Sequence, residues 1–185
     1  IEAGFSCEKF DAEQHLKSSN SDYRSLTVIV GCVDNYRARR EMHRALDEFR
    51  SYGESSRVWW IDGGNGKTSG QVLLGSTTKA LKPEQYFTGT SICRAIPSPS
   101  LQHPDLLQPE KIEVKSDLSC PERMRLGEQC LNINQRVAVE MAEVLTEMLL
   151  TRSLKRFAFY FDLESGASRS NYCTRDQIQG EVGPQ

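Results

Sequence analysis

Short apolar runs alternate along the chain with segments of helical periodicity. Residues 26–33 carry apolar and β-branched side chains on both faces, which predicts a buried parallel strand. Residues 36–52 follow with apolar side chains at three- and four-residue spacing, which predicts a helix with one buried face. That face consists of Met42, Ala45, Leu46 and Phe49. His43 is expected on the surface of this helix.

The later segments predict more strands and a second helix. Residues 57–62 and 71–76 predict two strands, separated by a loop at 63–70 that contains four glycines. Apolar residues recur at helical spacing again over 132–152. The remaining expectations are a short edge strand within 5–10, strands at 155–162 and 168–174, and a frayed tail at 180–185. We therefore expect a single α/β domain over 1–185, with an irregular segment at 77–130.

Composition excludes several classes of function. The formal net charge is −2, so the chain as a whole is not a binder of nucleic acids. No window approaches twenty apolar residues, so no membrane span is expected. The six cysteines are scattered without a C-x-x-C pair, and no secretory signal opens the chain. These features favour a cytoplasmic protein over a disulfide framework or a zinc site. The missing initial methionine suggests a processed or incomplete chain.

The first candidate site follows the strand at 26–33. Asp34 and Asn35 come directly after its end, and in open α/β sheets ligands bind beyond the carboxyl ends of the strands. A carboxylate there, beside a helix N-terminus, is well placed to hold a metal ion against phosphates. Asp and Asn are also preferred N-caps, so a purely structural capping role for either residue stays open.

The Gly-rich segment at 63–68 has some features of a phosphate loop. A phosphate loop requires a glycine five residues before Gly66, where this chain has Ile61. It also requires a following helix, whereas Gln71-Val-Leu-Leu is typical of a strand. We therefore predict a tight turn here.

Several sequence blocks resemble one family in order and spacing. Val33-Asp34-Asn35, with Arg39 five residues after the aspartate, is similar to the Thr/Val-Asp-Asn-x-x-x-Arg motif of the ThiF/MoeB/HesA family. Residues 59–66 and 70–75 resemble the next strand of that family, a glycine-bearing bend and its G-Q-V strand. Residues 117–121, 132–136 and 160–166 resemble its plasmid-borne PRTRC-type branch.

Members of this family are ATP-dependent activating enzymes for ubiquitin-like and sulfur-carrier proteins. The resemblance implies an α/β, Rossmann-like fold with a mixed sheet, ATP and Mg²⁺ as cofactors, a ubiquitin-like β-grasp protein as partner, and a homodimer. It implies that Asp34 binds Mg²⁺, that Asn35 and Arg39 help to bind the nucleotide, and that Asp62 and Gly64 border the site.

Cys120 is the candidate nucleophile. It lies in the irregular segment upstream of the second predicted helix, and the resemblance assigns this segment to a cysteine that can take an acyl group as a thioester. A reactive thiol requires a lowered pKa, and the cations nearest in sequence are Arg123 and Arg125. The alternative is an ordinary free cysteine. Cys130 and Cys173 are weaker candidates.

The chain departs from the family in one respect. It contains no G-x-G-x-x-G motif and no strand–turn–helix unit ahead of residue 26, so we expect it to correspond to the second half of the adenylation domain. A non-catalytic pseudoenzyme or protein-docking module is therefore an alternative. A generic oxidoreductase is a weaker one, because it would need the same missing fingerprint.

Overall fold

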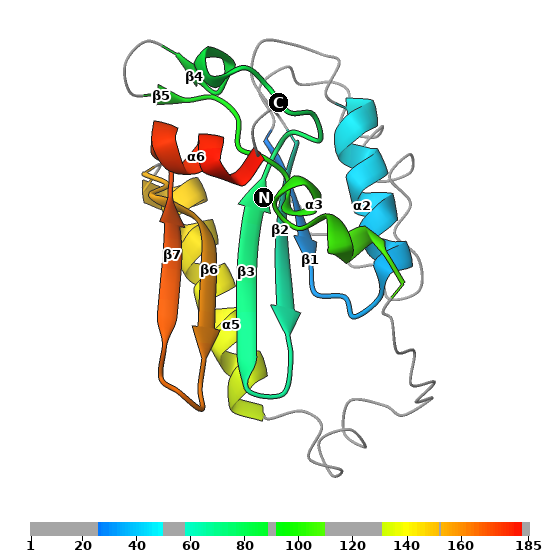
Figure 1. Ribbon diagram of the computed structural model, residues 1–185, viewed down its shortest axis with the longest axis vertical. Coiled ribbons are helices and arrows are strands. Elements are labelled where there is room, and N and C mark those ends of the chain that lie inside the picture. The colour runs from blue at the N-terminus through cyan, green and yellow to red at the C-terminus, as the bar shows by residue number, and fades with distance from the viewer. Residues whose placement is uncertain (1–25, 50–57, 89–91, 110–130, 152, 183–185) are drawn as a thin grey trace.

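A five-stranded mixed sheet organises the protein, with helices on both of its faces (Figure 1). The computed structural model describes residues 26–49, 58–88, 92–109, 131–151 and 153–182. The sheet has the order β1-β2-β3-β6-β7. Its strands are β1 (Thr27–Gly31), β2 (Val58–Asn65), β3 (Ser69–Gly75), β6 (Arg156–Asp162) and β7 (Ser168–Tyr172). β1 and β2 are parallel, and the other neighbouring strands pair antiparallel. This confirms an α/β fold with a mixed sheet.

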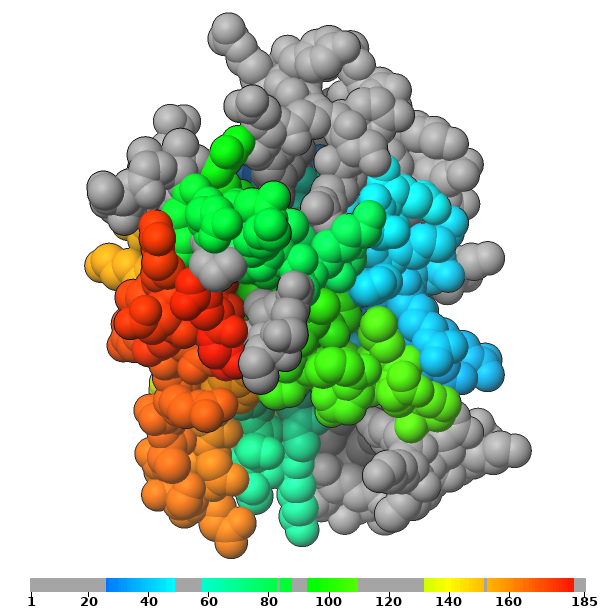
Figure 2. Space-filling view, turned by 45° about the horizontal axis from the view of Figure 1, so that its top comes forward, coloured from blue at the N-terminus to red at the C-terminus, as the bar shows by residue number. Residues whose placement is uncertain are grey.

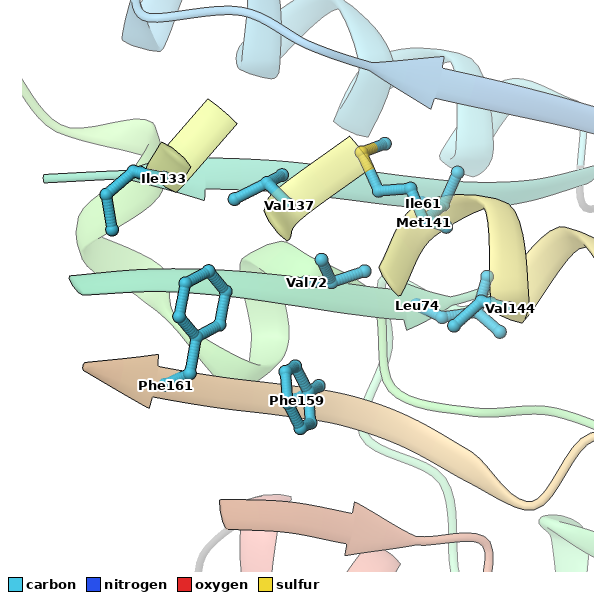
Figure 3. Close-up of a cluster of buried hydrophobic side chains, with 9 residues drawn as sticks. All are labelled: Ile61, Val72, Leu74, Ile133, Val137, Met141, Val144, Phe159 and Phe161. Atoms are coloured by element: carbon cyan, nitrogen blue, oxygen red, sulfur yellow. The ribbon is translucent and has the colours of Figure 1, made fainter. Parts of the chain in front are cut away.

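One face of the sheet is covered by α5 (Leu131–Thr146), which continues as a π-helical turn, η3 (Glu147–Thr151). Its apolar stripe packs against β2, β3 and β6 and forms a cluster of buried side chains with them (Figure 3). The members are Ile61, Val72, Leu74, Ile133, Val137, Met141, Val144, Phe159 and Phe161. The predicted helix at 132–152 is thus confirmed, although its last turn is not α-helical.

Helix α2 (Tyr36–Phe49) packs on the opposite face, against β1 and β2. Met42, Ala45 and Leu46 are buried there, as the spacing predicted. The shorter elements α3 (Pro99–Gln102), η2 (Pro104–Leu107) and α6 (Arg175–Val182) lie on this face too (Figure 1). Within the predicted irregular segment, the structure also contains η1 (Pro83–Gln85), β4 (Phe87–Thr88) and β5 (Ile92–Cys93).

Two predictions were wrong in part: the burial of the first strand and the extent of the loop at 63–70. β1 has a single neighbour among the described strands, and Val30 on it is 49% exposed. The strand is therefore not buried on both faces, because α5 lies over β2 and β3 and leaves Val30 uncovered. The predicted loop at 63–70 is instead the tip of a hairpin: Gly64 pairs with Gln71, and Asn65 pairs with Gly70.

Close packing accounts for glycines in this hairpin. A Cβ on Gly63 would lie 2.6 Å from Sδ of Met141, and a Cβ on Gly70 would lie 2.5 Å from Cζ of Phe161. Gly66 to Thr68 form the turn itself, closed by a hydrogen bond from Gly66 N to the Ser69 carbonyl at 2.8 Å. A strand follows Lys67 and Thr68, so the prediction of a tight turn is confirmed.

Two further differences concern the end of the chain. The frayed tail was a wrong prediction over 180–182, because α6 continues to Val182 and buries Ile178 in the core. The alternation over 155–162 holds for Ala158 to Phe161, but a β-bulge between Arg156 and Ala158 interrupts it. The extra residue turns Phe157 to the face that carries α6. The possible edge strand within 5–10 lies outside the described residues.

Candidate functional site

The candidate site lies at the carboxyl end of β1. Gly31 is the last residue of β1, and its register partner Asp62 lies within β2, which continues to Asn65. Asp34 and Asn35 lie in the connection from β1 to α2, and both are exposed. Such a strand end, with a helix N-terminus beside it, is where open α/β sheets bind ligands.

Asn35 caps helix α2. Its Oδ1 accepts a hydrogen bond from the Ala38 backbone N–H at 2.9 Å, which satisfies one of the donors that the first turn leaves unpaired. The capping role left open by the sequence therefore falls to Asn35. Asp34 stands next to this N-terminus with an exposed side chain, where the helix dipole favours negative charge.

Arg39 links the N-terminal part of α2 to Asp62 on β2. Its Nε lies 3.2 Å from Oδ2 and 3.3 Å from Oδ1 of Asp62. The Arg39 side chain is 11% exposed and that of Asp62 is fully buried. Breaking such a pair is costly, because either partner alone would be a buried charge. The structure thus brings Arg39 close to a carboxylate that the sequence placed only at the border of the site.

Burial decides the protonation behaviour of Asp62. Loss of hydration raises its pKa from 3.8 to about 6, although the charge and hydrogen bond of Arg39 and the nearby indole N–H of Trp60 lower it. Asp62 is therefore a carboxyl group that titrates close to neutral pH. Groups of this kind occur more often at functional sites than elsewhere.

Gly31 makes room for this arrangement. A Cβ at Gly31 would lie 2.9 Å from each of three atoms: Oδ1 of Asp62, Nε1 of Trp60 and Sδ of Met42. The Trp60 indole N–H is buried and close enough to the Asp62 carboxyl to lower its pKa, although the contact does not have the geometry of an ordinary hydrogen bond. It borders the same small space as the Asp62 carboxylate. Sequence reasoning missed this role of Trp60, but a lone acid in the run Trp59-Trp60-Ile61-Asp62 was a signal that a buried charge needs a partner.

A hydrogen-bonded chain lies farther along α2. His43 Nδ1 is 2.8 Å from Ser100 Oγ, which is in turn 2.9 Å from Ser98 Oγ. Burial lowers the pKa of His43, so the ring is neutral near pH 7. The prediction that His43 lies on the helix surface holds only in part, because Ser100 of α3 contacts the ring and the side chain is half-buried. Figure 2 shows α2 and the α3–η2 segment side by side, where Arg40 Nε donates to the Leu107 carbonyl at 2.8 Å.

The cysteines differ in whether the structure describes them and in how their surroundings shift the thiol pKa. Cys120 and Cys130 lie outside the described residues, so the nucleophile hypothesis stays a prediction. Burial raises the pKa of Cys173 to about 12, so its thiol is a poor nucleophile. Cys32 lies just after β1, with its Sγ 3.9 Å from Sδ of Met141, and burial and Asp62 raise its pKa.

Comparisons with protein-family models and with curated proteins find no match for this sequence. Its function is therefore inferred from the geometry of the site and from the sequence blocks.

At this edge of the sheet, Asp34 supplies an exposed carboxylate that could help to hold a metal ion. Across the described segments, no three His, Cys, Asp or Glu side chains lie close enough together to form a metal site. Mg²⁺ is commonly held by one or two carboxylates together with substrate phosphates and water. A single exposed carboxylate at Asp34 meets that requirement.

No helix in the described ranges is long and apolar enough to cross a bilayer.

Proposed function

We propose that this chain is part of an ATP-dependent activating enzyme of the ThiF/MoeB/HesA type, which adenylates the C-terminal carboxylate of a ubiquitin-like or sulfur-carrier protein. The elements β1, α2, β2 and β3 occur in the order of the sequence blocks that resemble this family. The parallel pair followed by antiparallel strands is compatible with a Rossmann-like nucleotide-binding sheet. In this proposal the enzyme is cytoplasmic and homodimeric.

The observation that carries the proposal is the position of Asp34. Its carboxylate is exposed directly after β1, next to the N-terminus of α2 that Asn35 caps. Arg39, which pairs with Asp62, follows five residues later on the same helix. A ligand phosphate at this edge would meet the positive end of α2 and an arginine fixed by a buried partner.

Each residue has a defined task in the proposed reaction. A carboxylate oxygen of the partner protein attacks the α-phosphorus of ATP, the bond from that phosphorus to the bridging oxygen breaks, and pyrophosphate leaves with the bonding electrons. Asp34 would hold Mg²⁺, whose charge offsets the negative charge that builds on the leaving group. Arg39 orients the phosphates, and Asn35 keeps the helix N-terminus in place.

Cys120 would act after adenylation. Its thiolate would attack the acyl carbon of the adenylate, forming a thioester and releasing AMP. This step is separable from the first, since adenylation requires Asp34 and Arg39 but no thiol.

A protein-docking module without catalysis is the second candidate. It is favoured by the hairpin at Gly66–Thr68, because the most Gly-rich segment of the sequence joins two strands and does not form a phosphate loop. ATP–pyrophosphate exchange separates the two candidates, since a docking module exchanges nothing.

The ATP–pyrophosphate exchange assay should use the full-length natural protein, with Mg²⁺, ATP and the purified carrier protein. Asp34→Asn should reduce exchange by at least about 100-fold, because it removes a charged ligand of the metal. Asp176→Asn, which changes an exposed acid on α6, is the matched control and should leave exchange unchanged. Exchange that survives Asp34→Asn would contradict the assignment of the metal site. No exchange in the wild-type protein, together with tight carrier binding, would favour the docking module.

A further inference from the structure

The Arg39 guanidinium is only partly used by its buried partner. Both of its hydrogen bonds to Asp62 come from Nε. The two terminal nitrogens make no hydrogen bond or ion pair within the described part of the chain. These nitrogens carry four of the five guanidinium N–H donors, arranged to bind an oxyanion with two parallel hydrogen bonds.

Asp62 is the counter-charge to Arg39, and within the described part of the chain Arg39 is the charged group that acts on its carboxyl. On the β1 side, the neighbouring titratable group is Cys32, whose raised pKa keeps the thiol protonated. On its own strand, the neutral Trp60 N–H borders the same space. On α2, His43 lies one turn beyond Arg39 and is neutral near pH 7. The charge balance at this point therefore depends on Arg39 and Asp62.

We propose that Arg39 binds an oxyanion through its terminal nitrogens and that Asp62 takes up one proton from solvent as the oxyanion binds. The inference rests on the proposed function only in placing an anion at Arg39, and it adds a coupling that adenylation does not require. Asp62 thereby becomes a positioning residue, which holds the Nε edge of Arg39 and adjusts the charge of the site.

The reason is electrostatic. An anion on Arg39 brings a second negative charge close to a buried carboxylate that shares the same cation. At a separation of roughly 6–7 Å and an effective dielectric constant near 20, this repulsion raises a carboxyl pKa by on the order of one unit or more. Because coupling is reciprocal, protonation of Asp62 strengthens anion binding by the same factor, about tenfold. The Asp62 pKa of about 6 places this effect at accessible pH values.

Sulfate is a suitable probe, because it keeps its full charge across the relevant pH range and is not consumed. The experiment titrates the side-chain carboxyl carbon of Asp62 by ¹³C NMR, with and without saturating sulfate. Sulfate is expected to raise the pKa of Asp62 from about 6 to about 7. Calorimetry should show about tenfold tighter sulfate binding at pH 5 than at pH 8. An unchanged Asp62 titration in saturating sulfate would overturn the proposal.

Three variants sharpen the test. Asp62→Asn should remove most of the pH dependence and bind sulfate at pH 8 about as tightly as the wild type does at pH 5. Arg39→Gln should abolish the effect of sulfate on Asp62. His43→Asn removes the titratable ring that lies one turn from Arg39 on α2 and should leave the coupling intact. Coupling lost in His43→Asn would assign the proton to that ring instead and overturn the role of Asp62.

This experiment and the exchange assay fail separately. If Asp62→Asn does not fold, the wild-type NMR titration still decides the question. Pyrophosphate exchange without a response of Asp62 to sulfate would leave the proposed function standing and overturn the coupling. A response of Asp62 without exchange would support the anion site and count against adenylation.

Discussion

Gly31 at the end of β1 and Asp62 within β2 are register partners, and a Cβ added to Gly31 would lie 2.9 Å from Oδ1 of Asp62. The same Cβ would be equally close to Trp60 Nε1 and Met42 Sδ. The glycine thus lets a buried carboxylate, an indole and the apolar face of α2 meet at one point. The missing side chain at Gly31 is therefore needed for the geometry of the site, in which Asp34, three residues later, is exposed to solvent.

Gly31→Ala should destabilise the protein and disturb the Arg39–Asp62 pair. The methyl group has to displace three side chains in a packed region, which typically costs about 1–3 kcal/mol. Urea denaturation followed by circular dichroism measures the free energy of unfolding. Gly180→Ala in α6 is the matched control, because a Cβ there meets nothing within 4 Å and alanine favours the helix. Equal stability of Gly31→Ala and wild type would show that the neighbours of Gly31 rearrange freely.

Asp62 should make stability depend on pH between about 4 and 6. Its pKa is about 6 in the folded protein and 3.8 as a free side chain, so the folded state binds more protons in this window. Stability therefore falls as pH rises from 3.8 through 6 and no longer changes through this group above that. The full effect is on the order of 3 kcal/mol, from the difference in pKa.

Asp62→Asn tests this dependence because an amide does not titrate. The stability of the variant relative to wild type should increase on going from pH 4 to pH 7, by up to about 3 kcal/mol. Urea denaturation of both proteins at several pH values gives the comparison. Parallel curves across the whole range would mean that the pKa of Asp62 is not raised by folding.

Local patterns predicted much of the fold, because the spacing of apolar residues and the residues that end each helix or strand are encoded within each segment. The face of Met42, Ala45 and Leu46 and the stripe of α5 both followed from spacing alone. Features that depend on distant packing were missed. Gly63 and Gly70 indicated a loop, but they serve the close approach of Met141 and Phe161, which come from elsewhere in the chain.

The candidate site divides in the same way. Asp34, Asn35 and Arg39 lie in one short segment, so their proximity follows from the sequence once a strand end and a helix start are recognised. The pairing of Arg39 with Asp62 spans 23 residues and depends on the register of β1 and β2. Sequence alone gave the acid but not its partner. The role of Cys120 stays a prediction, because no described residue bears on it.

Asn35→Ala should lower the stability of the protein by about 1 kcal/mol. The change removes the acceptor for the Ala38 N–H at 2.9 Å and leaves the first turn of α2 with one more unpaired donor. Asn35→Asp is the control, since aspartate caps a helix about as well and should cost little. Thermal denaturation of both variants measures the effect. A loss of equal size in both would indicate that Asn35 acts through something other than its cap.

Glu140 should contribute more to stability than an exposed acid on the same helix. Its side chain is 10% exposed and lies 2.9 Å from Arg136 and 3.5 Å from Arg156. The bulge in β6 allows Arg156 to reach α5, where its guanidinium also stacks 5.5 Å from the Phe159 ring. Removing the carboxylate leaves two cations near each other on a largely apolar surface.

Glu140→Ala is therefore expected to lower the free energy of unfolding by about 1–3 kcal/mol. Glu143→Ala, one turn along on the exposed side of α5, should change it by less than about 0.5 kcal/mol. Because the Glu140 carboxylate is mostly buried, most of the difference should persist in 1 M salt, where the Debye length is about 3 Å. Repeating the urea denaturation of the three proteins in 1 M sodium chloride measures this. If high salt removed the difference between the two variants, Glu140 would be acting as an ordinary surface charge, and the network with Arg136 and Arg156 would not stabilise the fold.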